Sequence, residues 1–459
     1  MSQQSVDKRE VSIDECLIVS NDQKTKKDIP DIITDFYYYE SILNETVRAQ
    51  ILYVDTGKSI RRGNSLLSIV EGMPLEKEED VRFRINDGRG NVIKMDMNIQ
   101  NINTISKDSK GSLVGLDLVS AEGIFNFKSV VKKRYDGKIS EHIKNILTDK
   151  DLLGTKKKID IEETQNNLNF FGNQKRPFYH LMWLSKKSVP KTPNSNGNTA
   201  GFVFFETSDG FKFKSIDGLL SETDPEGGKK NIKSYAMSDT PNLPAGYSGK
   251  ILDIVPPNPS GDAQKKLESG AYSTRTILFD PFTCYYEIVN PNIQGGGLGD
   301  EKNLQKAGKN LPKGNPKFIR EGNNKDFSRT QYYLLDKGTM PTGTGTGKGQ
   351  EQVVKSKEQN FDPKNILNQA SMRYNQLFSS QTEITIDADF SLHAGDLIWI
   401  HPPELSNKDN QEYDQKLGGH YLIAEICHYI SISEGGYTKI VAVRDSTGAK
   451  GNPIGKYNL

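Results

Sequence analysis

Short runs of β-branched, aromatic and aliphatic residues, closed by glycine-containing turns, dominate the chain between residues 384 and 445. This pattern predicts four strands. Gly435 and Gly436 separate the last two, and because both residues tolerate positive φ, they favour a tight hairpin. The run 419–430 is apolar at odd and even positions alike. Since successive side chains of a strand point to opposite faces, we expect this strand to be central and covered on both sides.

A second strand-rich unit is predicted nearer the N-terminus. Apolar residues alternate with polar ones in three runs, 47–53, 81–85 and 92–97. Period-two alternation is typical of half-buried strands, and the glycine-containing turn at 87–91 predicts that the last two runs form a hairpin. With a further strand at 113–119, this stretch carries enough strands to close a small barrel. Residues 1 to about 30 are polar, and we expect them to be loosely held apart from one short strand at 16–19.

Between the two strand-rich units the spacing of apolar residues changes to that of helices. We expect a first helix at 124–131, a second helix capped by Ser140, and a third whose first residue is Pro177. A β-hairpin is predicted after them, with its turn at Asp209 and Gly210. This part of the chain is therefore expected to be a mixed helical and hairpin insert.

Composition shifts sharply between residues 291 and 360, where glycine, lysine and asparagine are abundant. Such a segment supplies little core, so we expect a flexible insertion with local order only around 332–335. Because loop-closure entropy grows slowly with loop length, replacing residues 296–325 by a short Gly/Ser linker is expected to leave the fold intact. After the insertion, Pro363 is predicted to begin a helix that precedes the C-terminal strands.

These patterns predict a β-rich α+β fold, with two small antiparallel β-barrels and inserted helical and loop-rich domains. The expected segments are an N-terminal segment at 1–43, a first barrel at 44–125, a mixed helical and hairpin domain at 126–290, the flexible insertion at 291–360, and a second barrel with its preceding helix at 361–459. The chain has 459 residues, which is more than one hydrophobic core usually organises.

Charge and cysteine content narrow the functional classes. Sixty basic and 59 acidic residues leave a formal net charge of +1, so the overall balance favours neither nucleic acid nor a membrane surface as partner. Lysine runs such as 156–158 are interpreted as solvated surface. Three distant cysteines in apolar runs are expected to be buried thiols in a reducing compartment. We recognise no signal peptide and no membrane-spanning run, and expect a soluble protein that is made and assembled in the cytoplasm.

The patterns that suggest nucleotide binding are incomplete. Gly57, Lys58 and Ser59 match the end of a phosphate-binding loop, but Leu52 occupies the position of its first glycine, and no helix is predicted to follow. Without that glycine the backbone nest that cradles phosphates is missing. The sequence therefore predicts no nucleotide cofactor.

The patterns that suggest metal binding or hydrolysis are also weak. His393, His401, His420 and His428 lie in the C-terminal unit with Cys427. Eight residues of extended strand, about 26 Å, separate the last two histidines, so that strand cannot bring them to one metal. Neither a G-x-S-x-G elbow nor an H-E-x-x-H helix is present. We therefore assign no catalytic residue, no metal ligand and no cofactor.

The C-terminal strands carry a resemblance to a known family. The residues that support it are the turn His393-Ala394-Gly395-Asp396, His420 to Ile423, Cys427-His428, Gly436 to Thr438 and Val443 to Ser446, together with the earlier stretches Glu71 to Leu75 and Ser208 to Phe211. With these features the chain resembles the central hub protein of contractile-tail baseplates, known from T-even-type myophages and related to the VgrG hub of type VI secretion. These motifs are turns and packing positions, and none carries chemistry.

The resemblance implies a non-enzymatic, structural function. It implies two tail-tube-like barrels and a homotrimeric ring that joins the tail tube to the central cell-puncturing spike. The implied partners are the spike or tail lysozyme protein, the tube and tube-initiator proteins, the tape measure protein and the baseplate wedge proteins, with no sequence-specific nucleic acid and no stable membrane insertion. The implied location is the tail baseplate of the virion, after assembly in the host cytoplasm.

The two-sided apolar strand suggests where subunits would meet. Leu422, Ile423 and Tyr429 lie on it. If one face of this strand packs against a neighbouring barrel, that face would be exposed in a monomer, and these three residues would contribute to the interface between subunits.

Two functions of other classes remain as alternatives. One is a tail-associated peptidoglycan hydrolase, which zymography on peptidoglycan would reveal. The other is a tail protein that binds a receptor or carbohydrate, which exposed aromatic residues in loops would favour. Here the aromatic residues at 36–39 and 202–213, with Tyr285 and Tyr286, fall in strand-like runs. Core packing is therefore their expected role.

Overall fold

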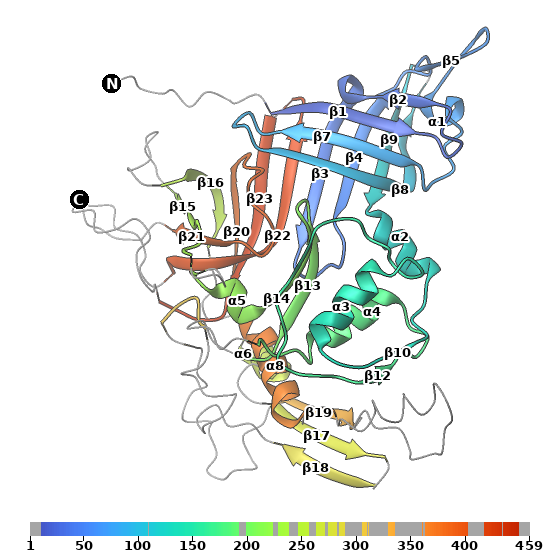
Figure 1. Ribbon diagram of the computed structural model, residues 1–459. Helices are drawn as coiled ribbons and strands as arrows, with labels where there is room; N and C mark the ends of the chain where they lie inside the picture. Colours follow the sequence, from blue (N-terminus) through green and yellow to red (C-terminus); the bar gives the residue numbers. More distant parts are fainter. Residues whose placement is uncertain are drawn as a thin grey trace, which may run out of the picture.

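The computed structural model describes most of the chain, and two strand-rich units dominate its upper half (Figure 1). The described residues are 11–108, 110–191, 199–223, 228–237, 247–256, 263–270, 274–281, 284–289, 305–309, 311, 329–335, 360, 363–402, 417–433 and 435–448.

The first unit is a curved antiparallel sheet of seven strands. In order across the sheet these are β2 (Lys26–Asp28), β1 (Ser12–Val19), β7 (Asp80–Asn86), β8 (Val92–Lys107), β9 (Ser112–Val119), β4 (Arg48–Asp55) and β3 (Ile33–Ser41). A 3-10 turn (Pro30–Ile32) precedes β3, and a separate hairpin, β5 (Ile60–Arg62) and β6 (Ser65–Leu67), leads into the short helix α1 (Ile69–Gly72). Alternate residues of β4 and β7 are buried, which confirms the predicted alternation.

The strands before residue 44 correct the expected start of this unit. Cys16 and Ile18 of β1, with Phe36 and Tyr38 of β3, are fully buried in the same core as β4 and β7. β1 is held to β7 along its whole length, with Cys16 opposite Phe83. The predicted strand at 16–19 is present within β1. The expectation that the first unit starts near residue 44 is wrong, since β1 and β3 are integral to its sheet.

The second unit is a closed barrel of six strands, β15 (Lys233–Ala236), β16 (Gly249–Val255), β20 (Ser380–Asp387), β23 (Gly435–Arg444), β22 (Gly419–Ser431) and β21 (Leu397–His401). Each strand pairs with the next, and β21 returns to β15 to close the ring. Two features differ from expectation. β15 and β16 come from the region assigned to the mixed domain, and β15 runs parallel to both of its neighbours.

One strand, β22, belongs to both units. Its first half pairs with β21, its second half pairs with β3, and β23 covers its other edge. A single hydrogen-bonded sheet of thirteen strands therefore runs from the first unit into the second. β22 is thus a central strand, as predicted, and its residues 419–424 are buried at odd and even positions alike. The predicted hairpin between β22 and β23 is present, but Gly435 and Gly436 pair with Ser431 and Ile430 at the start of β23 and do not form the turn itself. The φ of 87° at Gly435 suits glycine.

The insert between the units contains four short helices and a hairpin. Its elements are α2 (Ala121–Lys128), β10 (Arg134–Tyr135), α3 (Ile139–Thr148), β11 (Ile159–Ile161), β12 (Phe170–Phe171), α4 (Pro177–Ser185), β13 (Phe202–Thr207), β14 (Gly210–Ser215) and α5 (Ile216–Leu220). Pro177 begins its helix and Gly210 closes its hairpin, as predicted. Ser140 does not cap α3, because Lys138 holds the cap position and the Ser140 N–H is bound by Thr164 Oγ1 from another segment.

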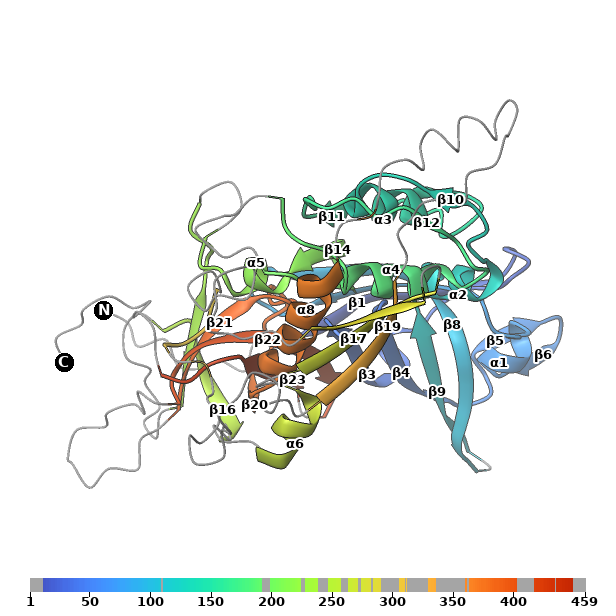
Figure 2. The ribbon, with the colours of Figure 1, turned by 90° about the horizontal axis from the view of Figure 1, so that it is seen from below.

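A third, smaller sheet lies at the end of the molecule away from the first unit (Figures 1 and 2). It has the order β18 (Tyr285–Val289), β17 (Thr274–Asp280), β19 (Arg329–Leu334), and it follows the helix α6 (Ala263–Ser269). The helix α8 (Pro363–Leu377) packs on β17 and begins at the predicted proline. β19 confirms local order near 332–335. Most of the insertion 291–360 lies outside the described residues.

Candidate functional site

The three residues predicted to lie in a subunit interface differ in how deeply they are buried. Leu422 and Ile423 are both fully buried in the core of the second barrel. Residues of both parities are buried here because this core also contains side chains of the insert, among them Phe205 and Leu219. The expectation that one of these two side chains would be exposed in a monomer is therefore wrong. Tyr429 is half-buried, donates a hydrogen bond of 2.8 Å to Asp35, and its place in an interface stays a prediction.

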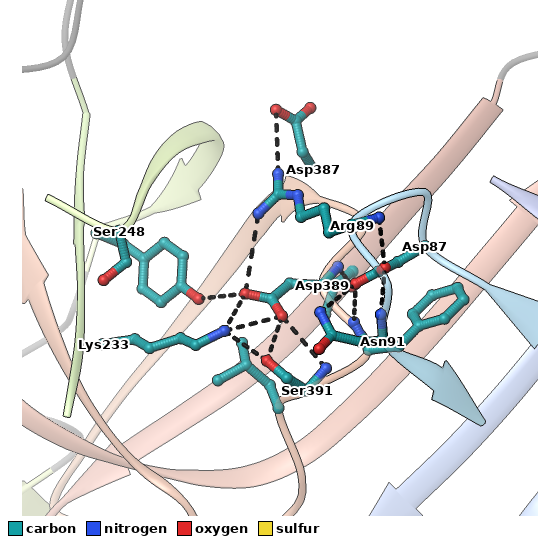
Figure 3. Close-up of polar contacts among 12 residues, drawn as sticks. Asp87, Arg89, Asn91, Lys233, Ser248, Asp387, Asp389 and Ser391 are labelled. Atoms are coloured by element: carbon teal, nitrogen blue, oxygen red, sulfur yellow. Dashed lines mark hydrogen bonds and ion pairs between the residues drawn. The ribbon is translucent and has the colours of Figure 1, made fainter. Parts of the chain in front are cut away.

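A buried polar cluster joins the first unit to the second barrel (Figure 3). At its centre is Asp389, which is 2% exposed and follows β20. Lys233 of β15 donates to the Asp389 carboxylate at 2.7 and 3.0 Å, and the Tyr235 hydroxyl donates at 3.0 Å. Ser391 Oγ donates to the other side of the carboxylate at 2.5 Å. The guanidinium of Arg89, from the turn between β7 and β8, lies 4.0 Å away. Asp389 therefore ties three segments together.

The turn between β7 and β8 contacts this cluster through the side chains of Arg89 and Asp87. Asp87 Oδ1 accepts the backbone N–H groups of Arg89 and Asn91 at 2.8 and 3.0 Å, which fixes the turn. The other oxygen, Oδ2, accepts the N–H of Phe390 at 3.2 Å, next to Asp389. The Asp87 carboxylate thus stabilises its own hairpin turn and also accepts a hydrogen bond from the backbone of the second barrel.

The cluster holds Asp389 in its charged form. Burial alone would raise the pKa of Asp389, but the hydrogen bonds from Lys233 and Ser391, with the positive charge of Lys233, bring this pKa below its usual value. A carboxylate with a depressed pKa stabilises the fold above its unfolded pKa and loses that contribution as pH falls. We call such a buried ionic contact between segments a junction, and this junction is expected to lose stability as pH falls.

A second buried pair joins the first unit, the insert and the second barrel. Glu40, at the end of β3, is 1% exposed. It accepts His393 Nδ1 at 3.2 Å, the Ala394 N–H at 3.0 Å, and the N–H of Ser208 from the hairpin turn of the insert at 2.8 Å. The turn that begins at His393 was identified from sequence as a packing turn, and the structure adds that it binds a buried carboxylate.

The two members of this pair shift each other's pKa. Burial would raise the pKa of Glu40, but its hydrogen bond and attraction to His393 lower it below the usual value. Burial would lower the pKa of His393, but Glu40 raises it above the usual value. Both partners are therefore charged over a wider pH range than either would be alone.

The geometry at His393 is unsuited to a Ser-His-acid triad. Ser208 Oγ lies 3.4 Å from His393 Nδ1, and the Glu40 carboxylate lies nearer to the same nitrogen at 3.2 Å. A triad needs the nucleophile and the orienting acid on opposite ring nitrogens. The other nitrogen is 3.7 Å from Asp209, which is largely exposed. This arrangement favours a structural ion pair.

A third junction is built on a lysine that sequence interpretation placed on the surface. Lys157 Nζ donates to Glu206 at 2.5 Å, Glu122 at 2.7 Å and Ser120 Oγ at 2.9 Å. Both carboxylates are buried, and Glu206 also accepts the N–H of Val47, next to β4. The interpretation of the run 156–158 as solvated surface is wrong for Lys157. Its two acidic partners lie 35 and 49 residues away in sequence, so no local signal marks it.

A fourth junction is built on a buried arginine. Arg373 of α8 is 1% exposed and donates to Asp217 at 2.7 Å and to Asp445 at 2.9 Å. Its guanidinium also donates to the Gln305 carbonyl at 2.9 Å, and the N–H of Ala307 donates to Asp445 at 3.1 Å. Residues 305–307 therefore complete a buried site. The expectation that 296–325 is dispensable for the fold conflicts with these contacts.

The remaining candidates for chemistry are reported for the described residues. Those residues contain no group of three or more His, Cys, Asp and Glu side chains placed to hold a metal ion. No helix among them has the length and apolar content needed to cross a membrane. Cys16 is buried and Cys427 half-buried, but Cys284 is exposed, so the expectation of three buried thiols is wrong for Cys284.

Of the aromatic residues that were expected in the core, some are buried and some are exposed. Phe36, Tyr38 and the phenylalanines of β13 and β14 are buried, as expected. Tyr285 and Tyr286 are 64% and 62% exposed, which corrects their assignment to the core.

The fold in which the seven-stranded sheet and the six-stranded barrel share β22 is similar to that of a solved phage tail protein. The 43 kDa tail protein of prophage MuSo2 from Shewanella oneidensis aligns with a TM-score of 0.51 and 10% sequence identity, over 94% of this chain and 99% of that chain. The predicted resemblance is thus confirmed at the level of the fold, and the β-rich fold class with it.

Two further solved structures align over most of the chain. A tail protein from Neisseria meningitidis gives a TM-score of 0.49 at 8% identity, over 95% of this chain and 97% of that chain. An Escherichia coli component of the type VI secretion system, described as structurally similar to the T4 tail proteins gp27 and gp5, gives 0.42 at 8% identity, over 97% and 80%. No family model and no curated protein sequence matches the chain.

Proposed function

We propose that this chain is a structural hub of a contractile phage tail, which forms a trimeric ring between the tail tube and the central spike. The observation that carries this proposal is the pair of strand-rich units fused through β22. Tail tubes of this class are sixfold and the spike is threefold. Three copies of a chain with two barrel-like units would present six such units to the tube and a threefold axis to the spike.

The four buried ionic junctions support a mechanical function. Each of them joins segments that are distant in sequence. Each also contains a charged residue that is at most 2% exposed, namely Asp389, Glu40, Glu206 and Arg373. Removing one partner from a buried pair costs several kcal/mol, about 3–5. Independent movement of the units would break these contacts. A hub that transmits force between tube and spike requires such a fixed arrangement.

The partners in this proposal are the spike protein, the tube and tube-initiator proteins, the tape measure protein and the wedge proteins. The proposed location is the baseplate of the virion, with assembly in the host cytoplasm. No step in this function makes or breaks a covalent bond.

Mass photometry of the purified full-length chain at micromolar concentration tests the proposal. We expect a species of three times the 51.3 kDa chain mass, alone or after addition of the spike protein from the same tail. A persistent monomer in the presence of that spike protein, or a closed hexamer of this chain, would exclude the hub. Zymography on peptidoglycan tests the hydrolase alternative, for which we expect no clearing.

A further inference from the structure

The small sheet of β17, β18 and β19 has one covered face and one apolar face that is open to solvent. The covered face packs on α8, where Thr276 of β17 bonds to Asn368 and Gln331 of β19 donates to Ser371 at 2.6 Å. Because side chains alternate along a strand, the residues between these positions point away from α8.

The strand pairing identifies the side chains of the open face. Ile277 lies opposite Ile288 on β18 and Tyr332 on β19, and Phe279 lies opposite Tyr286 and Leu334. We call this set the outer face: Ile277, Phe279, Tyr286, Ile288, Tyr332 and Leu334. All six are apolar or aromatic, so the alternation here places apolar residues toward solvent.

The exposure of the outer face is large. Tyr332 and Leu334 are 76% and 74% exposed, Tyr286 is 62% exposed, and Ile288 and Phe279 are about 40% exposed. Since a single aromatic side chain presents about 150–250 Å², the face exposes on the order of 500 Å². This lies toward the upper end of the largest patches on ordinary monomers, about 300–600 Å². It is more than half of the ~800 Å² that each partner contributes to a standard interface.

The insert also exposes several apolar side chains on α2, on β12 and at the start of α4. We call this set the helical patch: Phe125, Phe127, Val130, Phe171 and Tyr179, which are between 37% and 67% exposed. The guanidinium of Arg176 lies 4.1 Å from the ring centre of Phe127, and Lys175 lies 5.8 Å from that of Tyr179. Cations at this rim suit a partner surface that presents tyrosine rings.

Two unlike apolar surfaces on one chain are what a cyclic assembly requires. In a ring, each subunit offers one surface to the neighbour ahead and a different surface to the neighbour behind. We propose that the outer face of one copy binds the helical patch of the next copy. This inference rests on the proposed trimeric ring and names the surfaces that would close it.

Paired charge variants on both surfaces test this contact. The face variant is Tyr332→Lys with Leu334→Lys, and the helical variant is Phe127→Lys with Phe171→Lys. Lysine is well tolerated on exposed and edge strands, and all four residues are at least 64% exposed. The matched control is Leu66→Lys with Ile105→Lys, which are 53% and 55% exposed on the first unit. Circular dichroism melts confirm that each variant is folded.

We expect the wild type and the control to assemble equally, and each test variant alone to be monomeric by mass photometry. Loss of two interface anchors weakens association by at least ~100-fold. An equal mixture of the face and helical variants should form dimers, since each retains the one surface that the other lacks. Dimers that form only in the mixture would show that the contact joins two different surfaces.

Cys284 supplies a second readout without a further substitution on the face. This exposed thiol directly precedes β18, and in a Cys427→Ser background the only other cysteine, Cys16, is buried. Its maleimide labelling should be slower in assembled wild type than in the face variant at equal concentration.

The outcomes separate the contact from the proposed function. A wild type that assembles while the face variant also assembles overturns the contact and leaves the ring intact. A mixture that stays monomeric overturns the pairing of the two surfaces, and so does a control that dissociates like the test variants. A wild type that is monomeric even with the spike protein overturns both the contact and the ring.

Discussion

Arg373→Met is the sharpest test of how the buried ionic junctions act. Methionine fills a similar volume without charge, so the variant leaves Asp217 and Asp445 as carboxylates that are 1% and 0% exposed without their counter-ion. Asp217 keeps its bonds from Thr199, and Asp445 keeps those from Ala307 and Ser446. Both carboxylates thus keep some of their hydrogen bonds. We expect the unfolding free energy to fall by about 3–5 kcal/mol, the usual cost of breaking a buried pair. Domain stabilities are about 5–15 kcal/mol, so this loss is large.

The assay uses the two tryptophans of the chain. Trp399 lies on β21 in the second barrel and Trp183 lies on α4 in the insert. In a Trp183→Phe background, guanidinium unfolding followed by fluorescence reports on the second barrel alone. Since a chain of several units need not unfold in one step, this local probe is preferable to a global melting temperature.

The control is Arg82→Met, which breaks an exposed pair with Asp96 whose side chains are 49% and 71% exposed. Exposed pairs contribute about 0–1 kcal/mol, so little change is expected. The loss in Arg373→Met should also shrink as pH falls, because burial raises the pKa of Asp217, which takes up a proton in the folded state. A midpoint for Arg373→Met equal to that of Arg82→Met, or a loss that grows in acid, would refute the reasoning.

Three further outcomes are expected. Leu422→Asp and Ile423→Asp should each abolish folding of the second barrel, because both side chains are fully buried and an unpaired carboxylate there costs several kcal/mol; circular dichroism measures this. His393→Gln should reduce stability most between about pH 4.5 and 6.5, because the raised pKa of His393 acts until pH rises through it and the lowered pKa of Glu40 acts until pH falls through it; denaturant midpoints across pH measure this. Replacing residues 296–325 should lower the stability of the second barrel, since the contacts of 305–307 with the Arg373 site are lost; the Trp399 unfolding midpoint measures this.

Each of these has its own contradicting result. A folded Leu422→Asp monomer would mean that this side chain reaches solvent after all. A constant difference between His393→Gln and wild type across the whole pH range would show that charge is irrelevant to the pair. For the linker variant, replacement of residues 312–325 alone is the matched control, and equal midpoints for the two replacements would show that 305–307 contribute nothing.

The sequence predicts those parts of the fold whose signals are local. Alternation in the run 47–53, the prolines at 177 and 363, and the glycines at 210 and 435 each report on their own neighbourhood, and each indicates the element that the structure contains. Periodicity indicated only residues 16–19 of β1 and did not indicate β15. In β1 a bulge interrupts the register beside Asp14, and β15 is only four residues long and derives its place from parallel pairing with β21.

The junctions were missed for a related reason. Arg373 and Asp217 are 156 residues apart, and Glu40 and His393 are 353 residues apart. A charged residue in a loop or on a helix has the same local pattern whether it meets water or a buried partner. The family resemblance indicates the His393 turn, but nothing in the sequence indicates that Glu40 is its acidic partner.

The strand shared by the two units has a consequence for how the chain is made. β3 pairs with β22 across at least 384 residues, the separation of Ser41 and Glu425. At about 5–20 residues per second, a ribosome needs roughly 20–80 s to deliver the second strand after the first. During that interval the edge of β3 that β22 later covers lacks its partner, and unpaired edges promote aggregation. The chain should therefore depend on chaperones while it is being synthesised, far more than a chain whose barrels each close on their own.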